Sequence, residues 1–214
     1  MTEPVVRRHL VPAQGKHQTS DLQSPLTYDQ KVEIFYEQTF GWQLHVADLI
    51  ANGGATLPQI NTSEPGQIVP RIRHSGFAVL HICLSYFELV GSIVSLKVSS
   101  IGRFKAGVKE VLPEILQGTL GTFDDDNLLK LLYKGARCGL YHSARPAAPI
   151  GLGQPSGQKA MAFDKGSGKV IISSELLPRA LKAHLTKFKD DLLDPNMPAL
   201  RRRFEERFDK GFPD

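Results

Sequence analysis

One continuous apolar segment, residues 76–96, dominates the sequence (GFAVLHICLSYFELVGSIVSL). It is long enough to cross a lipid bilayer. Glu88 stands near its centre, where an acidic side chain costs about 2.5 to 3.5 kcal/mol on insertion scales. Because further polar side chains interrupt the same stretch, we predict a buried core helix and no membrane partner. A small membrane-associated protein built around this segment remains the alternative.

Further helices are predicted on both sides of this segment from the spacing of apolar residues. A helix from Thr27 onward has apolar side chains every three or four residues and ends at Asn52-Gly53-Gly54. Amphipathic stretches predict helices at 101–116, after the acidic run at 124–126, and at 175–192. The runs 160–163 and 169–173 flank a Gly-rich turn and predict a β-hairpin. The fold class is therefore mainly α, a helical bundle with a small β-hairpin before the last of these helices.

A chain of 214 residues fits one domain with short tails. Residues 1–27 are rich in polar residues and proline without an apolar period, which predicts a mobile N-terminal tail. Residues 28–192 form the predicted helical domain. Residues 193–214, with Arg201-Arg202-Arg203, are expected to be a basic C-terminal tail.

Charge and cysteine content narrow the location and the partners. The net charge of +4 allows a polyanionic partner without requiring one. Two cysteines, Cys83 and Cys138, are too few for a disulfide framework and lack the spacing of a zinc site. The N-terminus lacks the apolar run of a secretory signal, so a cytoplasmic location is expected. The three consecutive aspartates at 124–126 point in different directions and are typical of a helix cap, so no metal and no cofactor are expected.

Two Arg–His pairs with four intervening residues are candidates for chemistry. They are Arg137 with His142 and Arg179 with His184. Pairs at this spacing arise by chance in a chain of this composition, so only the sequence surrounding each pair can distinguish them. Arg179 and His184 lie on a surface helix but not on one face of it, which indicates an incidental pair. Arg137 and His142 instead follow a leucine-rich helix.

The context of the first pair carries a family resemblance. LLYKGARCGLYHS, preceded some fifty residues earlier by LSYFE, resembles the HEPN superfamily, whose mark is Arg, four to six residues, then His. It is most similar to plasmid-associated HEPN proteins in which a hairpin and a further helix follow the motif. The resemblance covers about residues 30–192 and implies a helical bundle that forms a homodimer through its motif helices. In many members the domain is a metal-independent endoribonuclease in a toxin–antitoxin or phage-defence role, with RNA and an antitoxin or defence protein as partners.

The residues suit that chemistry independently. Cleavage of RNA without a metal needs a base for the 2′-hydroxyl proton, an acid for the leaving oxygen and a cation for the developing phosphorane charge. An imidazole such as that of His142 can be base or acid near neutral pH, and two copies across a dimer supply both. The planar fork of Arg137 matches two phosphate oxygens. Such a site requires a 2′-hydroxyl, so DNA is expected to resist it. The resemblance adds Glu88 as the acidic residue that orients Arg137.

Each of these residues has a structural alternative. Arg137 and His142 also fit the C-terminal end of a helix, where cations interact with exposed carbonyls. Glu88 equally fits a buried structural partner of some Lys or Arg. Tyr141 is a candidate for stacking on a base, although a ring packed into the core is the more common fate of such a residue. His81, on an apolar helix, is expected to be a satisfied core histidine.

Two further motif residues, Cys138 and Gly139, are candidate substrate-binding positions with Tyr141. Active members of the family usually carry a small polar residue, often Asn, directly after the Arg, where this chain has Cys138. A thiol is a weak hydrogen-bond donor, which favours the second hypothesis, a catalytically silent HEPN module that binds RNA or a partner protein. Gly139 allows close approach of another backbone, as in a tight dimer, or ends the helix.

Overall fold

The structure is a computed structural model that describes residues 25–53, 70–97, 99–117 and 125–211. Most of the predicted N-terminal tail lies outside these ranges, as do residues 54–69. Leu26 belongs to the predicted tail but is buried, at 7% exposure, against the helical core. The described domain therefore begins slightly before residue 28.

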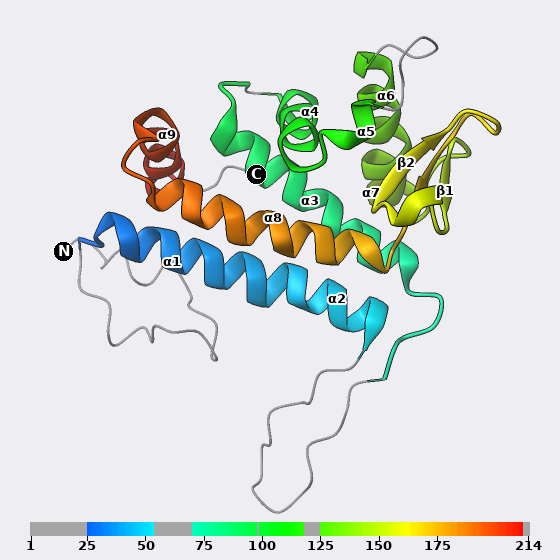
Figure 1. The fold of residues 1–214 in the computed structure, drawn as a ribbon, viewed down its shortest axis with the longest axis horizontal. Coiled ribbons are helices and arrows are strands. Elements are labelled where there is room, and N and C mark those ends of the chain that lie inside the picture. The colour runs from blue at the N-terminus through cyan, green and yellow to red at the C-terminus, as the bar shows by residue number, and fades with distance from the viewer. Residues whose placement is uncertain (1–24, 54–69, 98, 118–124, 212–214) are drawn as a thin grey trace, which may run out of the picture.

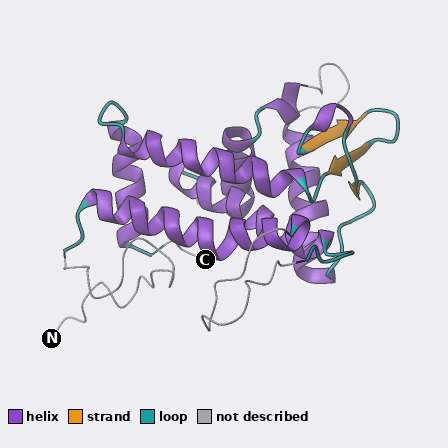
Figure 2. Cartoon of the chain, turned by 60° about the horizontal axis from the view of Figure 1, so that its bottom comes forward, coloured by secondary structure: helices purple, strands orange, loops and turns teal. Residues whose placement is uncertain are grey.

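Helices make up most of the described chain, and one small sheet accompanies them at one end (Figures 1 and 2). The mainly α class is thus confirmed. The helical elements are α1 (Tyr28–Gln38), η3 (Thr39–Leu44), α2 (His45–Asn52), α3 (Gly76–Val94), α4 (Ser100–Val111), α5 (Glu114–Gln117), α6 (Asp125–Leu131), η4 (Leu132–Cys138), α7 (Gly139–Ser143), η5 (Ser156–Gln158), α8 (Leu176–Leu193) and α9 (Pro198–Asp209). The strands are β1 (Ile150–Leu152), β2 (Met161–Asp164) and β3 (Lys169–Ile172).

The first three helical elements form one continuous helix. Thr27 begins it with a capping box, because its hydroxyl oxygen accepts from the Gln30 N–H at 3.2 Å and its own N–H donates to the Gln30 side chain at 2.9 Å. A π-helical turn, η3, lies in its middle. Gly53, at φ 66°, ends it, as the sequence predicts.

Helix α3 is the core helix of the domain and contacts α2, α4, α8 and α9. Its length and composition alone would allow it to cross a membrane, but 56% of its apolar stretch is buried inside the protein. Phe77 is 44% exposed, because the N-terminal part of α3 is covered on fewer sides. The buried side chains and glycine of α3 are Val79, Leu80, Cys83, Leu84, Tyr86, Phe87, Val90, Gly91, Ser92 and Ile93.

Helices α3 and α4 meet at a pair of glycines. A Cβ added at Gly91 would lie 1.8 Å from the carbonyl oxygen of Arg103, and one added at Gly107 would lie 1.8 Å from the carbonyl oxygen of Phe87. No side chain fits in such a space, so the two backbones touch directly. This close crossing brings the N-terminal turn of α4 beside Glu88 on α3.

The sheet contains the predicted hairpin and one strand that was not predicted. β2 and β3 pair antiparallel, and β1 pairs parallel with β3 on its other side, in the order β1-β3-β2. β1 falls within the Pro- and Gly-rich residues 146–157, where no strand is predicted from the sequence. The sheet lies against the helix that carries the Arg137–His142 motif, residues 125–143. The Ala147 N–H donates to the Gly135 carbonyl at 2.8 Å, and Ile150 packs over Gly135.

The C-terminal segment differs from the predicted basic tail. α8 occupies nearly the predicted range and runs alongside α1 and α2 (Figure 1), but residues 193–214 contain a further helix, α9. Phe204 and Phe208 of α9 are buried in the core, four residues apart. The charged side chains of the segment lie around these two rings, so α9 is an amphipathic part of the domain.

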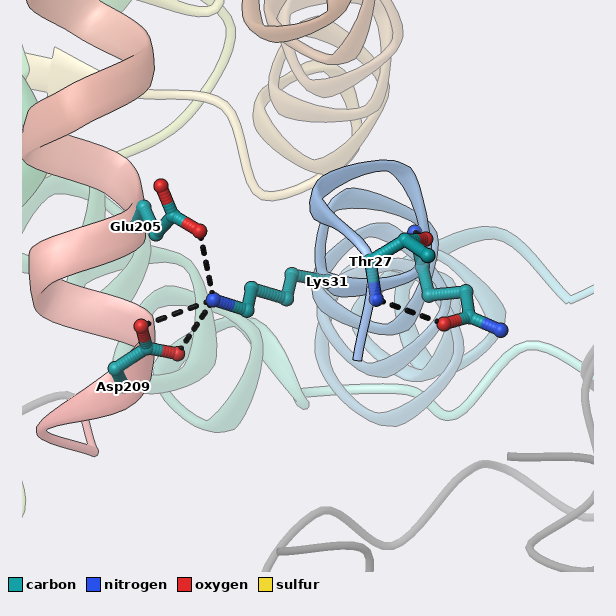
Figure 3. A network of polar contacts seen from close by, with 5 residues as sticks. Thr27, Lys31, Glu205 and Asp209 are labelled. Carbon is teal, nitrogen blue, oxygen red and sulfur yellow. Dashed lines mark hydrogen bonds and ion pairs between the residues drawn. The ribbon is translucent and has the colours of Figure 1, made fainter. Parts of the chain in front are cut away.

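An ion cluster joins α9 to α1. The Lys31 ammonium lies 2.8 Å from a Glu205 carboxylate oxygen and 2.9 Å from Asp209 (Figure 3). Lys31 is only 8% exposed. Burial alone would lower the pKa of Lys31, but its hydrogen bonds to the two carboxylates outweigh burial and raise it.

Candidate functional site

The Arg137–His142 motif lies on one helix that runs from Asp125 to Ser143 through α6, η4 and α7. Leu128, Leu129 and Leu132 hold its first half against the core. The middle of this helix, η4, is π-helical and ends one residue after Arg137. Ala144, in the left-handed conformation at φ 54°, ends the helix two residues after His142. The motif thus begins in a widened turn, a feature often found at functional sites.

Arg137 forms an ion pair with Glu88 on the neighbouring helix α3. The Arg137 Nε donates to Glu88 Oε1 at 2.7 Å, and Nη2 donates to Oε2 at 3.5 Å. Both side chains are mostly buried, at 28% and 17% exposure. The contact that the family resemblance implies between these two residues is therefore present.

The second oxygen of Glu88 is held from α4. The Ser100 hydroxyl donates to Glu88 Oε2 at 3.2 Å, so the carboxylate is fixed from two sides. Burial alone would lower the pKa of Arg137, but the hydrogen bond and the charge of Glu88 outweigh burial and raise it. Among the described residues, no acceptor other than Glu88 is recorded for this guanidinium, so Nη1 remains available for a ligand.

Tyr141 lies one helical turn after Arg137 and is 63% exposed. The centre of the Arg137 guanidinium lies 5.0 Å from the centroid of the Tyr141 ring, a cation–π contact. The expectation that this ring packs into the core is wrong, because the end of the motif helix projects beyond the bundle. The exposed ring remains a candidate for stacking on a base.

A pocket of about 170 Å³ opens beside this cluster. Its lining residues come from α3 and from the motif helix: His81, Leu84, Ser85, Arg137, Leu140 and Tyr141. His81, predicted to be a core histidine, is exposed, and its ring lies nearly parallel to that of Tyr141, with centroids 6.3 Å apart. The spacing of His81, Ser85 and Glu88 in the sequence could have indicated that His81 is exposed, because it places three polar side chains on one face of an otherwise apolar helix.

His142 is exposed but does not line this pocket. Its ring contacts Tyr141 edge to face, with centroids 5.2 Å apart. No contact between His142 and Arg137 is recorded within the described part of the chain, because five residues of α-helix turn the side chain by about 140°. The structure therefore brings together Glu88, Arg137 and Tyr141, and His142 contacts Tyr141 without lining the pocket.

The remaining two motif residues are Cys138 and Gly139. Cys138 is a half-buried free thiol next to Arg137 in the chain. Gly139 lies inside the helix and does not end it. It has helical dihedrals, and a Cβ added there would lie 3.0 Å from the Arg145 carbonyl oxygen and 3.1 Å from the Ala147 nitrogen. Because Gly139 has no side chain, the backbone at residues 145–147, which follows the motif helix, can pack directly against it.

The second Arg–His pair is structural. His184 Nδ1 lies 2.9 Å from the Tyr86 hydroxyl, and burial, with a smaller contribution from Lys187, lowers the pKa of His184 to about 4. Arg179 is 60% exposed, and its guanidinium lies 3.8 Å from a carboxylate oxygen of Asp48. These side chains point to different neighbours and form no joint site.

No metal centre is found in the described ranges, where no group of three or more His, Cys, Asp or Glu side chains is arranged to hold an ion. Of the predicted acidic cap, Asp124 lies outside the described residues. Asp126 instead pairs with Lys105 and Lys130, whose hydrogen bonds lower the pKa of Asp126 to about 2.

No protein-family model, curated protein sequence or solved structure matches this chain. Any function therefore has to follow from the residues around Arg137.

Proposed function

We propose that this protein is a metal-independent endoribonuclease of the HEPN type, which cleaves single-stranded or loop RNA by attack of the 2′-hydroxyl on the adjacent phosphate. One observation carries the proposal: Glu88 fixes the Arg137 guanidinium beside exposed Tyr141, and the exposed imidazole of His142 contacts that ring edge to face. A fixed cation and an accessible imidazole are the two groups that this reaction requires.

Arg137 is the phosphate-binding group in this mechanism. Glu88 accepts from Nε and Nη2, which leaves the two N–H groups of Nη1 to donate to the non-bridging oxygens of the scissile phosphate. Their charge stabilises the phosphorane that forms when the 2′-oxygen attacks. Lys134 and Arg145, both exposed near the motif, add positive charge along the path of the RNA backbone.

His142 transfers protons. One imidazole removes the proton from the 2′-hydroxyl, and a second protonates the departing 5′-oxygen. The position of His142 outside the pocket leaves its ring accessible to a second copy of the chain, which supports a homodimer with a composite site. Light scattering at micromolar concentration tests this arrangement: a dimer supports it, and a monomer that still cleaves RNA contradicts the two-copy site.

A catalytically silent HEPN module that binds RNA or a partner protein is the second candidate. Cys138 favours it, because this half-buried thiol is a weak donor at the position where a polar side chain would help to orient the phosphate. The cytoplasmic location is proposed from the N-terminal sequence, whereas the toxin–antitoxin or defence role and the antitoxin or defence partner follow from the family resemblance alone.

The decisive experiment compares wild-type protein with His142→Ala on a labelled single-stranded RNA and the matching DNA in EDTA. The expected result is cleavage of RNA only, with 2′,3′-cyclic phosphate ends, lost in His142→Ala. The matched control is His74→Asn, which replaces another exposed histidine, at φ 60°, with a residue that tolerates that conformation. Inhibition by EDTA, or equal cleavage by His142→Ala, would contradict the mechanism. Binding of RNA without cleavage would favour the silent module.

A further inference from the structure

The pocket beside Arg137 is framed by two aromatic rings from different helices. His81 comes from α3 and Tyr141 from α7, sixty residues later in the sequence. The two ring planes are inclined by only 8°, with centroids 6.3 Å apart. Both rings line the pocket, so a flat ligand there can lie parallel to both of them at once.

The rest of the pocket suits a nucleotide. Arg137 contributes a cation to the lining, where a phosphate attached to the flat group can reach it. Leu84 and Leu140 give the pocket an apolar side. The Ser85 hydroxyl donates to the Ile82 carbonyl at 2.7 Å, which leaves its oxygen lone pairs to accept from an N–H group on the ligand. A planar ring, a phosphate and an N–H donor together describe a nucleobase with its backbone.

We propose that His81 and Tyr141 form a stacking site for one unpaired base of the RNA, next to the phosphate that Arg137 holds. This inference rests on the proposed RNA substrate and assigns His81 a binding role that the Arg–His motif does not contain. A base that stacks against this aromatic pair has to leave the base stack of a duplex, so the site selects single-stranded RNA. In this arrangement His81 positions the substrate through its flat ring and does not transfer a proton.

The test is binding of a fluorescein-labelled, single-stranded 2′-O-methyl RNA, which lacks the attacking hydroxyl and stays intact. Loss of a stacking ring is expected to weaken binding by about 5- to 150-fold, the equivalent of about 1 to 3 kcal/mol per stacked base. His81→Ala and Tyr141→Ala should each show this loss, and the double variant should lose less than the product of the two, because both rings contact the same base. A matched abasic oligomer should bind wild type and both variants equally weakly.

Two further variants separate stacking from other roles. Trp42→Ala removes an aromatic ring that is 49% exposed on η3, outside the pocket, and should leave affinity unchanged. His81→Phe keeps a flat ring but cannot titrate, so binding of the 2′-O-methyl RNA and cleavage of ordinary RNA should both persist. Both substituted pocket residues are exposed, so circular dichroism should show an unchanged fold in every variant.

The failures are distinguishable. Unchanged affinity in His81→Ala and Tyr141→Ala, with RNA still cleaved by wild type, overturns the stacking site and leaves the ribonuclease. Loss of cleavage in His81→Phe with unchanged binding also overturns it, and would show that His81 transfers a proton. If wild type neither binds nor cleaves RNA, the proposed function and the stacking site are both wrong.

Discussion

Glu88 and Arg137, forty-nine positions apart in the chain, meet through a 2.7 Å hydrogen bond between the central core helix and the motif helix. The pair is mostly shielded from water and is supported by the Ser100 hydroxyl. Its members therefore interact more strongly than exposed ion pairs do, and neither is easily removed alone.

A double-mutant cycle should show this coupling. Glu88→Gln and Arg137→Gln, alone and together, are expected to give an interaction free energy of about 1 to 2 kcal/mol in urea unfolding. The i,i+4 pair of Asp126 and Lys130, which is half exposed, serves as the comparison and should couple much more weakly. Additive effects at Glu88 and Arg137 would mean that the pair contributes nothing specific.

The shape of the guanidinium should matter as much as its charge. Arg137→Lys keeps a cation but loses the planar fork that contacts Glu88 and the phosphate together, so single-turnover cleavage of RNA is expected to fall by about 100-fold. Arg179→Lys, at the structural Arg–His pair, should leave cleavage unchanged. A fully active Arg137→Lys variant would remove Arg137 from the proposed mechanism.

The crossing of α3 and α4 should not tolerate a single methyl group at its glycines. Gly91→Ala and Gly107→Ala each place a carbon 1.8 Å from a backbone carbonyl oxygen, which forces the helices apart, so we expect a loss of stability of about 3 kcal/mol or more. Gly102→Ala is the control on the same helix, because its Cβ would meet only side-chain atoms of Lys97 and Ser99. Chemical denaturation measures all three, and equal effects would contradict the close crossing.

His184 should make stability depend on pH in the acid range. Its pKa is about 4 in the folded protein, against about 6.5 in an unfolded chain, so below pH 6.5 the unfolded state binds the proton first. Stability should therefore fall as the pH decreases from about 6.5 to about 4, with a slope from this group of at most about 1.4 kcal/mol per pH unit. Urea unfolding at several pH values tests this, and His184→Gln should flatten that part of the profile.

The Lys31 cluster should hold α9 on the domain. Lys31→Met removes a buried ammonium that binds both Glu205 and Asp209, and we expect it to destabilise the protein by about 1 to 2 kcal/mol. Amide hydrogen exchange in α9 should increase more than in α3. Arg71→Met, at a pair in which the arginine is 57% exposed, should have little effect on either measurement.

The sequence predicts best where the signal is local. Apolar length was enough for the helix over 76–94, and a Gly-rich turn between two short apolar runs was enough for the hairpin. Parallel pairing of β1 with β3 has no such signal, because Pro149 and Gly151 look like loop residues until a distant strand pairs with them. α9 was missed because its many charges obscured two buried phenylalanines four residues apart.

Within the site, the motif and the family resemblance identified Arg137 and its partner Glu88. They did not predict which neighbouring side chains are exposed to solvent. His81 and Tyr141 were expected in the core since they neighbour apolar residues, yet the ends of α3 and α7 extend past the helices that would cover them. Which face of an apolar helix remains uncovered depends on the packing of the whole chain. The π-helical turns likewise follow from hydrogen-bond register, which no residue pattern here predicted.

The π-helix η4 also bears on how this chain can change length. Each of its turns holds one residue more than an α-helical turn, with hydrogen bonds from i to i+5 such as that from the Gly139 N–H to the Lys134 carbonyl. Deleting one residue there would restore α-helical register, whereas a deletion in α3 would rotate everything beyond it by about 100°. A natural or engineered single-residue deletion is therefore best accommodated directly before Arg137, where the helix can shorten and still present Arg137 to Glu88.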